Sequence, residues 1–323
     1  MKKILSILSL MLLLTGCGSQ TASTSAPESK GIKDVTVAFL PNEGSVTLSP
    51  MSQMLVDEIQ KALGDSYTVK GVVVDDYAAV TEAMLTGTAQ IAWESGATFA
   101  KTNMEDSAII PLVTYGVDGK LDNASYTAYI ATNIDNKADF EGKTRDQKLE
   151  QLKGKSFSFV SATSTSGRLV PTTSLYLEFG PEGRKAVTSK SQIFEKTDKE
   201  GGIFSEIMFG GNHPGSVLNI VDKKAYAGAF CCQYGKDAID KLYIIDQVQV
   251  PNGPLWVNSK YIDADMQAKI TEHFVKLTPE TSVEGFFADD EKGFFWESDG
   301  AGKNRFIKVP DGFYDFVFKM YQD

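Results

Sequence analysis

A short run of hydroxyl residues ending in glycine is the part of the chain whose residue types and spacing best suit chemistry. It reads Thr163-Ser164-Thr165-Ser166-Gly167 and joins an apolar, strand-like segment at 156–160 to a helix-like segment at 166–179. Unpaired N–H groups at a helix start carry partial positive charge, and hydroxyls there add hydrogen-bond donors. Gly167 would let a ligand approach the backbone closely. Ordinary capping needs only one of these hydroxyls, so the run indicates either a cap or, with its extra donors, a site for a tetrahedral oxyanion.

The histidines leave little scope for catalysis or metal binding. The chain has two, His213 before Pro214 at a second helix start and His273 beside Phe274, and no pair of residues has metal-ligand spacing. A nucleophile made of Cys231 or Cys232 with His213 remains an alternative, because strand ends cluster in α/β folds, but no motif supports it. We therefore expect no catalytic residue, no metal and no cofactor.

Strand-like and helix-like segments alternate along the chain, which predicts an α/β fold with a largely parallel sheet. Strands are expected at 35–40, 68–74, 91–93, 127–131, 156–160, 226–230, 242–245 and 255–257, and helices at 50–63, 77–86, 166–179, 214–223, 264–277 and 313–321. One α/β unit is inserted near the middle of another, which indicates two lobes with a ligand cleft between them. We expect lobe 1 at 34–131 and 249–323, and lobe 2 at 132–248.

The N-terminus has the pattern of an export signal. Lys2 and Lys3 precede an apolar run, 4–14, that is too short to span a membrane comfortably, and Leu14-Thr15-Gly16-Cys17 resembles the bacterial lipobox. We expect a signal peptide at 1–16, a lipidated Cys17 and a flexible tether over 17–33. A plain signal peptide with an incidental cysteine is the alternative. Either way, the prediction is an extracytoplasmic body, and lipidation would anchor it to the bacterial cell membrane.

The net charge argues against two classes of binding partner, and the cysteines argue against a disulfide framework. The formal net charge of -10 becomes -12 once Lys2 and Lys3 leave with the signal, which disfavours nucleic acid and anionic membrane surfaces as partners. An acidic protein can still bind an anion through N–H groups and hydroxyls. The remaining cysteines, Cys231 and Cys232, are adjacent and cannot join distant segments. We expect two thiols; a strained vicinal disulfide is the alternative.

Several motifs together resemble those of phosphonate, phosphite and phosphate solute-binding proteins of ABC importers. They occur in order and in both expected lobes: Asp76-Tyr77-Ala78-Ala79-Val80 with Gly87 and Ile91-Ala92-Trp93, then Lys153-Gly154-Lys155 with 163–167 and Leu169-Val170-Pro171, then Gly210-Gly211-Asn212-His213. The resemblance implies a two-lobed periplasmic-binding-protein-like fold. It also implies a small oxyanion ligand, an ABC permease as partner and a monomeric binder.

The resemblance assigns roles to individual residues. Ser164, Thr165 and Ser166 would hold the phosphonate oxygens, with Gly167 beside them, while Tyr77, Tyr126 and His213 would line the cleft. For the tyrosines a place in the core is the alternative, and for His213 a place near the helix cap without ligand contact.

The sequence also departs from the family pattern. Pro214 follows His213, and Tyr226 stands where relatives often have an acidic residue. Without acidic residues in the cleft, a ligand ammonium would have no counter-charge, which argues against aminoalkylphosphonates. Glu94 and Ser95 stand where relatives commonly carry other residues, so we place both near the cleft mouth. Glu94 would either meet a cationic or protonated part of the ligand or be solvated, and we expect it to be solvated.

The expected function is that of a solute-binding lipoprotein that closes two lobes over a phosphonate, phosphite or phosphate and hands it to an importer. Three alternatives remain. The first is a binder of another anion, such as a sulfonate, nitrate or a phosphorylated vitamin precursor. The second is a hydrolytic enzyme. The third is a structural or adhesive lipoprotein, in which the hydroxyl run is only a cap.

Overall fold

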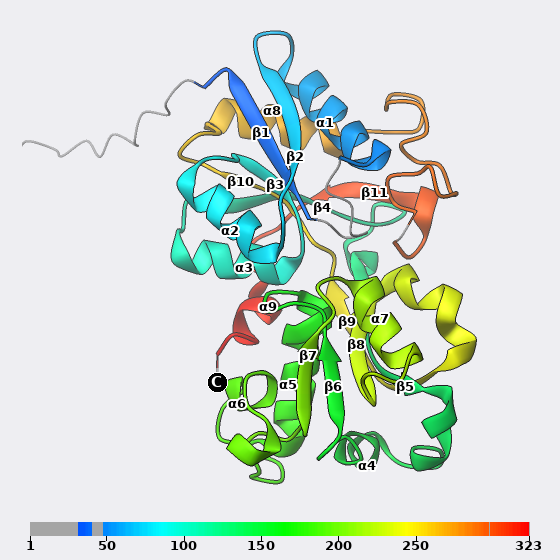
Figure 1. The fold of residues 1–323 in the computed structure, drawn as a ribbon. Coiled ribbons are helices and arrows are strands. Elements are labelled where there is room, and N and C mark those ends of the chain that lie inside the picture. The colour runs from blue at the N-terminus through cyan, green and yellow to red at the C-terminus, as the bar shows by residue number, and fades with distance from the viewer. Residues whose placement is uncertain (1–31, 41–47, 297, 323) are drawn as a thin grey trace, which may run out of the picture.

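The computed structural model describes residues 32–40, 48–296 and 298–322, which form two α/β lobes, each built on one mixed sheet (Figure 1). The two-lobed α/β prediction is confirmed. The expected signal peptide, Cys17 and all but the last residues of the tether lie outside the described residues. Both sheets are mixed and not largely parallel, because the strands that carry the chain between the lobes return antiparallel to their neighbours.

The first lobe contains a six-stranded sheet in the order β11-β4-β10-β3-β1-β2. Its strands are β1 (Asp34–Phe39), β2 (Thr68–Val73), β3 (Ile91–Trp93), β4 (Ile109–Val117), β10 (Leu255–Asn258) and β11 (Asn304–Lys308). β1 pairs in parallel with β2 and β3, while β10 and β11 run antiparallel to β4. The C-terminal part of the chain therefore rejoins the first lobe.

Helices cover both faces of this sheet. Leu55 and Ile59 of α1 (Pro50–Leu63) pack with Ile270 of α8 (Ala264–Val275) in one buried cluster. α2 (Tyr77–Thr86) and α3 (Gly96–Glu105) cover the other face. α1 starts at Ser49, whose hydroxyl accepts the Ser52 N–H over 3.0 Å. Such caps explain why the start of α1 could be predicted from the sequence.

The second lobe contains a five-stranded sheet in the order β7-β6-β8-β5-β9. Its strands are β5 (Ser125–Asn133), β6 (Ser156–Phe159), β7 (Glu206–Phe209), β8 (Ala227–Cys231) and β9 (Leu242–Pro251), and its helices are α4 (Arg145–Glu150), α5 (Val170–Phe179), α6 (Ser191–Phe194) and α7 (His213–Val221). The expected lobe boundaries at 131 and 249 fall inside β5 and β9. Both strands pair along their length within the second sheet, so the chain crosses at 118–124 and 252–254.

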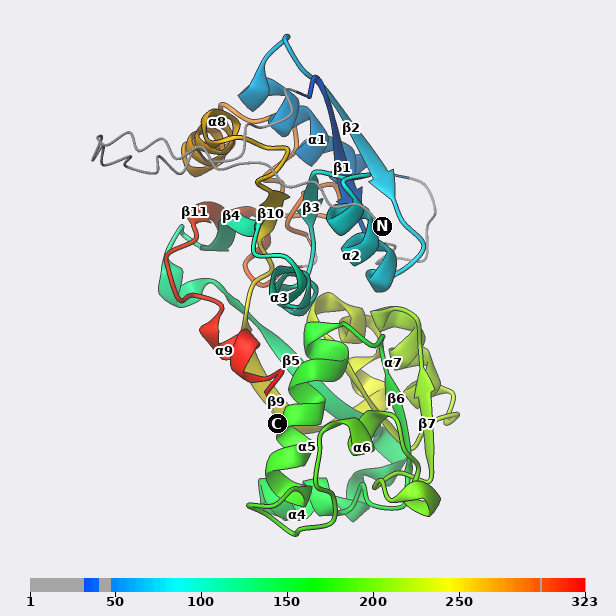
Figure 2. The ribbon, with the colours of Figure 1, turned by 90° about the vertical axis from the view of Figure 1, so that its left-hand side faces the viewer.

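The lobes touch beside these two crossings. One buried cluster joins Phe99 and Trp256 of the first lobe to Tyr126 and Leu169 of the second. α9 (Asp315–Lys319) lies at the side of the junction between the lobes (Figure 2). After it, the Tyr321 hydroxyl donates to the Ala97 carbonyl of the first lobe over 3.0 Å, and the Met320 carbonyl accepts from Lys190 of the second over 3.1 Å. The structure is therefore closed, with the lobes packed against one another.

Candidate functional site

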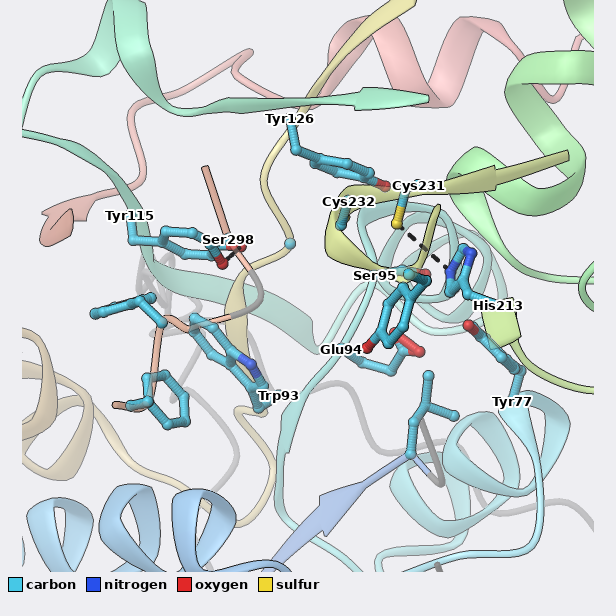
Figure 3. A pocket seen from close by; sticks show the side chains of 15 residues that line it. Tyr77, Trp93, Glu94, Ser95, Tyr115, Tyr126, His213, Cys231, Cys232 and Ser298 are labelled. Atoms are coloured by element: carbon cyan, nitrogen blue, oxygen red, sulfur yellow. Dashed lines mark hydrogen bonds between the residues drawn. The ribbon is translucent and has the colours of Figure 1, made fainter. Parts of the chain in front are cut away.

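A cavity of about 160 Å³ lies between the lobes and is lined by both (Figure 3). Five residues singled out from the sequence line it: Tyr77, Glu94, Ser95, Tyr126 and His213. The hydroxyl run at 164–167 does not line the cavity itself. Tyr126, which lines the cavity, donates a hydrogen bond to Ser166 of this run.

The hydroxyl run is fully buried at the start of a helix. Ser164 caps a π-helical turn, Thr165–Leu169, that leads into α5, and its Oγ accepts the Gly167 N–H over 3.1 Å. The Thr165 Oγ1 accepts the backbone N–H of Ala97, in the first turn of α3, over 2.8 Å. The run therefore does cap a helix, and it also meets the start of a second helix from the opposite lobe.

Gly167 is required by packing between a helix and a strand. A Cβ placed on Gly167 would lie 2.3 Å from the Cβ of Val160, just after β6. Real Cβ atoms do not approach so closely, so a larger residue would push the helix away from the strand. Gly167 therefore allows close approach of the chain to itself, and its expected place beside a ligand stays a prediction.

Tyr77 and Tyr126 connect the cavity to the hydroxyl run. The Tyr126 hydroxyl, from β5, donates to Ser166 Oγ over 3.5 Å. Burial, and then the nearby charge of Glu94, raises the pKa of Tyr77 well above its usual range, while a hydrogen bond with Ser164 partly offsets the rise. Burial likewise raises the pKa of Tyr126. Both hydroxyls therefore keep their protons near neutral pH and can donate.

Glu94 is buried in the cavity wall, so the expectation that it is solvated is wrong. Its residue exposure is 6%, and neither carboxyl oxygen has a hydrogen-bond partner within the described ranges. Burial raises the pKa of this carboxyl well above its usual range, and the Ser95 hydroxyl offsets the rise only in part. The Ser95 hydroxyl caps α3 by accepting the Thr98 N–H. The cleft therefore holds an acidic group, which removes the argument against a cationic or protonated ligand.

His213 lies against a cysteine, an arrangement the sequence left open. His213 is buried at the start of α7, and its Nε2 lies 3.7 Å from Cys231 Sγ. Burial would raise the pKa of the Cys231 thiol, but hydrogen bonds with Cys232 and His213 outweigh it, so the pKa lies well below its usual value. Cys231 and Cys232 are free thiols and both line the cavity. The expectation of two thiols is confirmed; their place in the cavity wall was not expected.

An aromatic wall forms the other side of the cavity, where Figure 3 shows Trp93, Tyr115 and Ser298 facing the group around His213. The Trp93 ring centroid lies 5.5 Å from that of Tyr115 and 5.2 Å from that of Phe294. Phe295 packs 4.8 Å from Tyr115. Sequence reasoning missed this wall, because most of it comes from irregular segments without periodicity.

Tyr234 also lines the cavity, and its ring stacks on that of His213 with 5.2 Å between the centroids. Among the residues that the structure describes, no group of three or more His, Cys, Asp or Glu side chains could hold a metal ion. A helix long and apolar enough to cross a membrane is also absent from these residues.

Comparison with known sequences identifies one family. The profile of a family described as "ABC transporter, phosphonate, periplasmic substrate-binding protein" matches residues 37–296. The phosphate-import protein PhnD of Mycolicibacterium smegmatis is 26% identical over 231 residues, which cover 71% of this chain and 65% of that protein. The match therefore spans slightly less than two thirds of the relative's length.

Solved structures share the fold. PhnD1 from Prochlorococcus marinus, in complex with methylphosphonate, superposes with a TM-score of 0.66 at 17% identity, covering 89% of this chain and 97% of that one. A binding-protein component of an ABC phosphonate transporter from Pseudomonas aeruginosa has a TM-score of 0.62 at 16% identity, covering 89% and 85%. Likeness at such low identity establishes the two-lobed fold.

Proposed function

This chain belongs to the periplasmic substrate-binding proteins of phosphonate ABC transporters, and we propose that it encloses a small phosphorus oxyanion between its lobes and delivers it to an importer. Phosphonate, phosphite and phosphate are the candidate ligands. The M. smegmatis relative is named for phosphate import, and the P. marinus neighbour holds methylphosphonate. Both names point to a tetrahedral phosphorus centre.

The observation that most supports this proposal is the meeting of two helix starts, one from each lobe, behind the cavity. Ser164 and Thr165 each accept a backbone N–H, and a hydroxyl that accepts a hydrogen bond still has its own proton to donate. Helix starts favour negative charge. This corner of the cavity is therefore suited to an anion although the chain as a whole is acidic.

Tyr77, Tyr126 and His213 would make the first contacts with the ligand oxygens. The bond from Tyr126 to Ser166 is 3.5 Å long, at the outer limit for a hydrogen bond. An oxyanion oxygen can replace it at little cost, which would bring Ser164, Thr165 and Ser166 into reach of the ligand. In this scheme the Tyr126 hydroxyl bonds to Ser166 while no ligand is bound, and both side chains can bond to the ligand once it enters.

The size of the cavity favours a small ligand. A cavity of about 150 Å³ accommodates a molecule the size of benzene, and this one measures about 160 Å³. Phosphate, phosphite and methylphosphonate fit that size, whereas a phosphorylated vitamin precursor is too large for the closed form. A small sulfonate or nitrate would fit, so chemistry and not size must separate these anions.

Closure of the two lobes would couple binding to delivery. Ligands that contact both lobes stabilise the closed form over the open one. We propose that the closed monomer docks on the membrane permease of the importer.

We further propose that Cys17 carries a lipid that holds the body outside the membrane. Cys17→Ala would then release the protein into the medium. Mass spectrometry should detect the acyl chains on the N-terminal peptide of the wild type.

A hydrolytic function is the second candidate, because His213 and Cys231 are 3.7 Å apart. A catalytic histidine needs a third group to fix its tautomer. His213 Nδ1 has no hydrogen-bond partner within the part of the chain that the structure describes. We therefore propose a binding protein and not an enzyme. Turnover of a phosphonate ester by the purified protein would overturn this.

Thermal melting with added ligands tests the proposed function. The purified protein is melted with phosphite, phosphate, methylphosphonate, 2-aminoethylphosphonate and sulfate. A ligand present at 100 times its Kd stabilises the folded state by about 2.7 kcal/mol, so at least one phosphorus oxyanion should raise the Tm in proportion to the logarithm of its concentration. Ser164→Ala with Thr165→Ala should abolish this rise.

The matched control is Thr144→Ala, which removes a capping hydroxyl at the start of α4, at the end of the second lobe away from the first (Figure 1). It should lower stability by about 1 kcal/mol and leave the ligand-dependent rise unchanged. If no phosphorus oxyanion raises the Tm of the wild type, the proposed function is wrong.

A further inference from the structure

Two neighbouring thiols face the cavity from the end of β8. Cys231 is the last residue of β8 and Cys232 follows it, and both line the cavity (Figure 3). Successive side chains of a regular strand point to opposite faces of its sheet. Cys232 leaves the strand with a φ of 60°, a left-handed conformation that residues other than glycine rarely adopt. This turn allows the two thiols to meet, and they form a hydrogen bond with one another.

The first thiol is surrounded by hydrogen-bonding groups. Cys231 is only 5% exposed. Its Sγ lies 3.7 Å from His213 Nε2, and the Ser166 hydroxyl donates to it. Burial alone would raise the pKa of this thiol, but hydrogen bonds with Cys232, His213 and Ser166 outweigh burial and hold the pKa well below its usual value. More of this group is therefore thiolate at neutral pH than in an ordinary cysteine, and the thiolate is the nucleophilic form.

The second thiol is placed to react with the first. Cys232 is half-buried, and its sulfur already contacts that of Cys231. Cysteines that sense oxidants typically combine a lowered pKa with a second cysteine close by, which displaces the oxidised group and forms a disulfide. Cys231 and Cys232 have this arrangement within one turn of the chain.

A small oxidant can reach these thiols in the compartment where the family works. The family is described as periplasmic, and exported proteins meet oxidising conditions. The cavity of about 160 Å³ is large enough for benzene, so hydrogen peroxide fits it easily. Hydrogen peroxide is also neutral, so the acidic groups in the cavity wall do not repel it.

We propose that Cys231 and Cys232 are an oxidisable thiol pair, in which a small peroxide modifies Cys231 and Cys232 then forms a disulfide with it. The reaction needs no phosphorus ligand, so it is independent of the proposed function although it takes place in the same cavity. It modifies the protein's own thiols and turns over no substrate. A disulfide between neighbouring residues is strained and hence easily reduced, so the modification is reversible.

The first step oxidises Cys231. Its thiolate sulfur attacks one oxygen of hydrogen peroxide, so an S–O bond forms while the O–O bond breaks. The sulfur is oxidised to a sulfenic acid, and the second oxygen is reduced and leaves as hydroxide. This hydroxide becomes water by taking the proton that the thiol gave up. His213 can hold that proton until then, because its buried Nδ1 has no hydrogen-bond partner among the described residues.

The second step joins the two cysteines. The Cys232 sulfur attacks the Cys231 sulfur, the S–S bond forms, and the S–O bond breaks. The hydroxide that leaves takes the thiol proton of Cys232 and becomes water. One peroxide and two thiols thus give one disulfide and two molecules of water.

The test exposes the purified, reduced protein to hydrogen peroxide at pH 7 and follows the tryptic peptide 225–236 by mass spectrometry. This peptide contains Cys231 and Cys232 and excludes Cys17. Its mass should fall by that of two hydrogen atoms, and dithiothreitol should restore it. A peptide that stays reduced, or that forms disulfides only between two protein molecules, would overturn the proposal.

A matched pair of variants identifies the thiol that reacts first. In Cys232→Ser the reaction should stop at the sulfenic acid of Cys231, which dimedone traps. In Cys231→Ser the remaining Cys232 should react with peroxide at least tenfold more slowly. Equal rates in the two variants would overturn the role of Cys231. If either variant does not fold, brief labelling of the wild type with iodoacetamide decides the question, because it should modify Cys231 at least tenfold more than Cys232.

A bound ligand tests whether the reaction takes place in the cavity. Ser166 and His213 are expected ligand contacts and also surround the Cys231 sulfur. A saturating phosphorus oxyanion that raises the Tm should therefore slow the oxidation at least tenfold, and an equal rate with and without it would overturn the proposal. This measurement alone rests on the proposed function. If no phosphorus oxyanion raises the Tm, the proposed function is refuted, and the disulfide and the labelling ratio still decide the role of the thiols.

Discussion

Thr165 Oγ1, in the second lobe, accepts a hydrogen bond from the backbone N–H of Ala97, in the first lobe, over 2.8 Å. Thr165 and Ala97 are both fully buried. The bond joins the starts of two helices from opposite lobes, so it can exist only while the lobes are closed. It thereby links the hydroxyl run directly to the closed form.

Thr165→Val should weaken closure and ligand binding together. The substitution keeps the shape of the side chain and leaves the Ala97 N–H without its partner, which costs about 1–2 kcal/mol. We expect ligand affinity to fall about 5- to 30-fold by calorimetry. Thr172→Val is the control, because the buried Thr172 hydroxyl has no partner among the described residues. It should leave affinity unchanged; an equal loss in both variants would contradict the role of Thr165.

Tyr126→Phe should reduce affinity without unfolding the protein. It removes the hydroxyl that donates to Ser166 at the long distance of 3.5 Å, so stability should change by less than about 1 kcal/mol. Affinity should fall about tenfold, because the ligand loses one donor in a buried site. Tyr129→Phe, on the same strand and stacked on Phe230, serves as the control and should bind normally. Normal binding by Tyr126→Phe would remove Tyr126 from the site.

Gly167→Ala should destabilise the second lobe. Its Cβ would lie 2.3 Å from the Val160 Cβ, and overpacking of this kind typically costs about 1–3 kcal/mol. The unfolding free energy from urea titration measures the cost. Val160→Gly in the same chain removes the Cβ of that contact and should recover part of the cost, which a double-mutant cycle would show as a positive coupling. Additive effects of the two substitutions would contradict the clash.

Glu58 should make stability depend on pH in the acid range. Burial raises its pKa, but hydrogen bonds from His273, Val283 and Lys61 outweigh burial, so the net pKa is lowered. A lowered pKa in the folded state means that the stabilisation is complete above the unfolded value of about 4.3 and is lost as the pH falls through the folded value. Wild type should exceed Glu58→Gln by about 1–2 kcal/mol at pH 7, and urea titrations should show the gap closing below about pH 4. A gap independent of pH would contradict this.

The sequence predicted most of the regular elements because their ends carry local signals. Ser49 with Pro50 marks the start of α1, and Gly87 in a left-handed conformation ends α2. β4 was missed, since Pro111 interrupts a run that has no clear alternation. β11 and α3 lacked strong periodic patterns as well.

The site was predictable only in part, for a physical reason. Tyr77 and His213 belong to local motifs and could be named from them, and Tyr126 was named from the family resemblance without a motif of its own. The burial of Glu94 could not, because the cavity wall around it includes Cys231 and Gly253, which are far away in the sequence. The local sequence pattern predicts where a helix starts. It does not predict which distant segments will pack over a given residue and bury it.

Gly253 lies on the second crossing between the lobes and passes close under the end of β3. A Cβ at this position would be 2.2 Å from the Glu94 carbonyl oxygen, so the crossing segment and the backbone of Glu94 are in direct contact. A side chain at position 253 would push this crossing away from the strand that carries Glu94. The absence of a side chain at Gly253 therefore sets the distance between the crossing segment and the wall of the cavity.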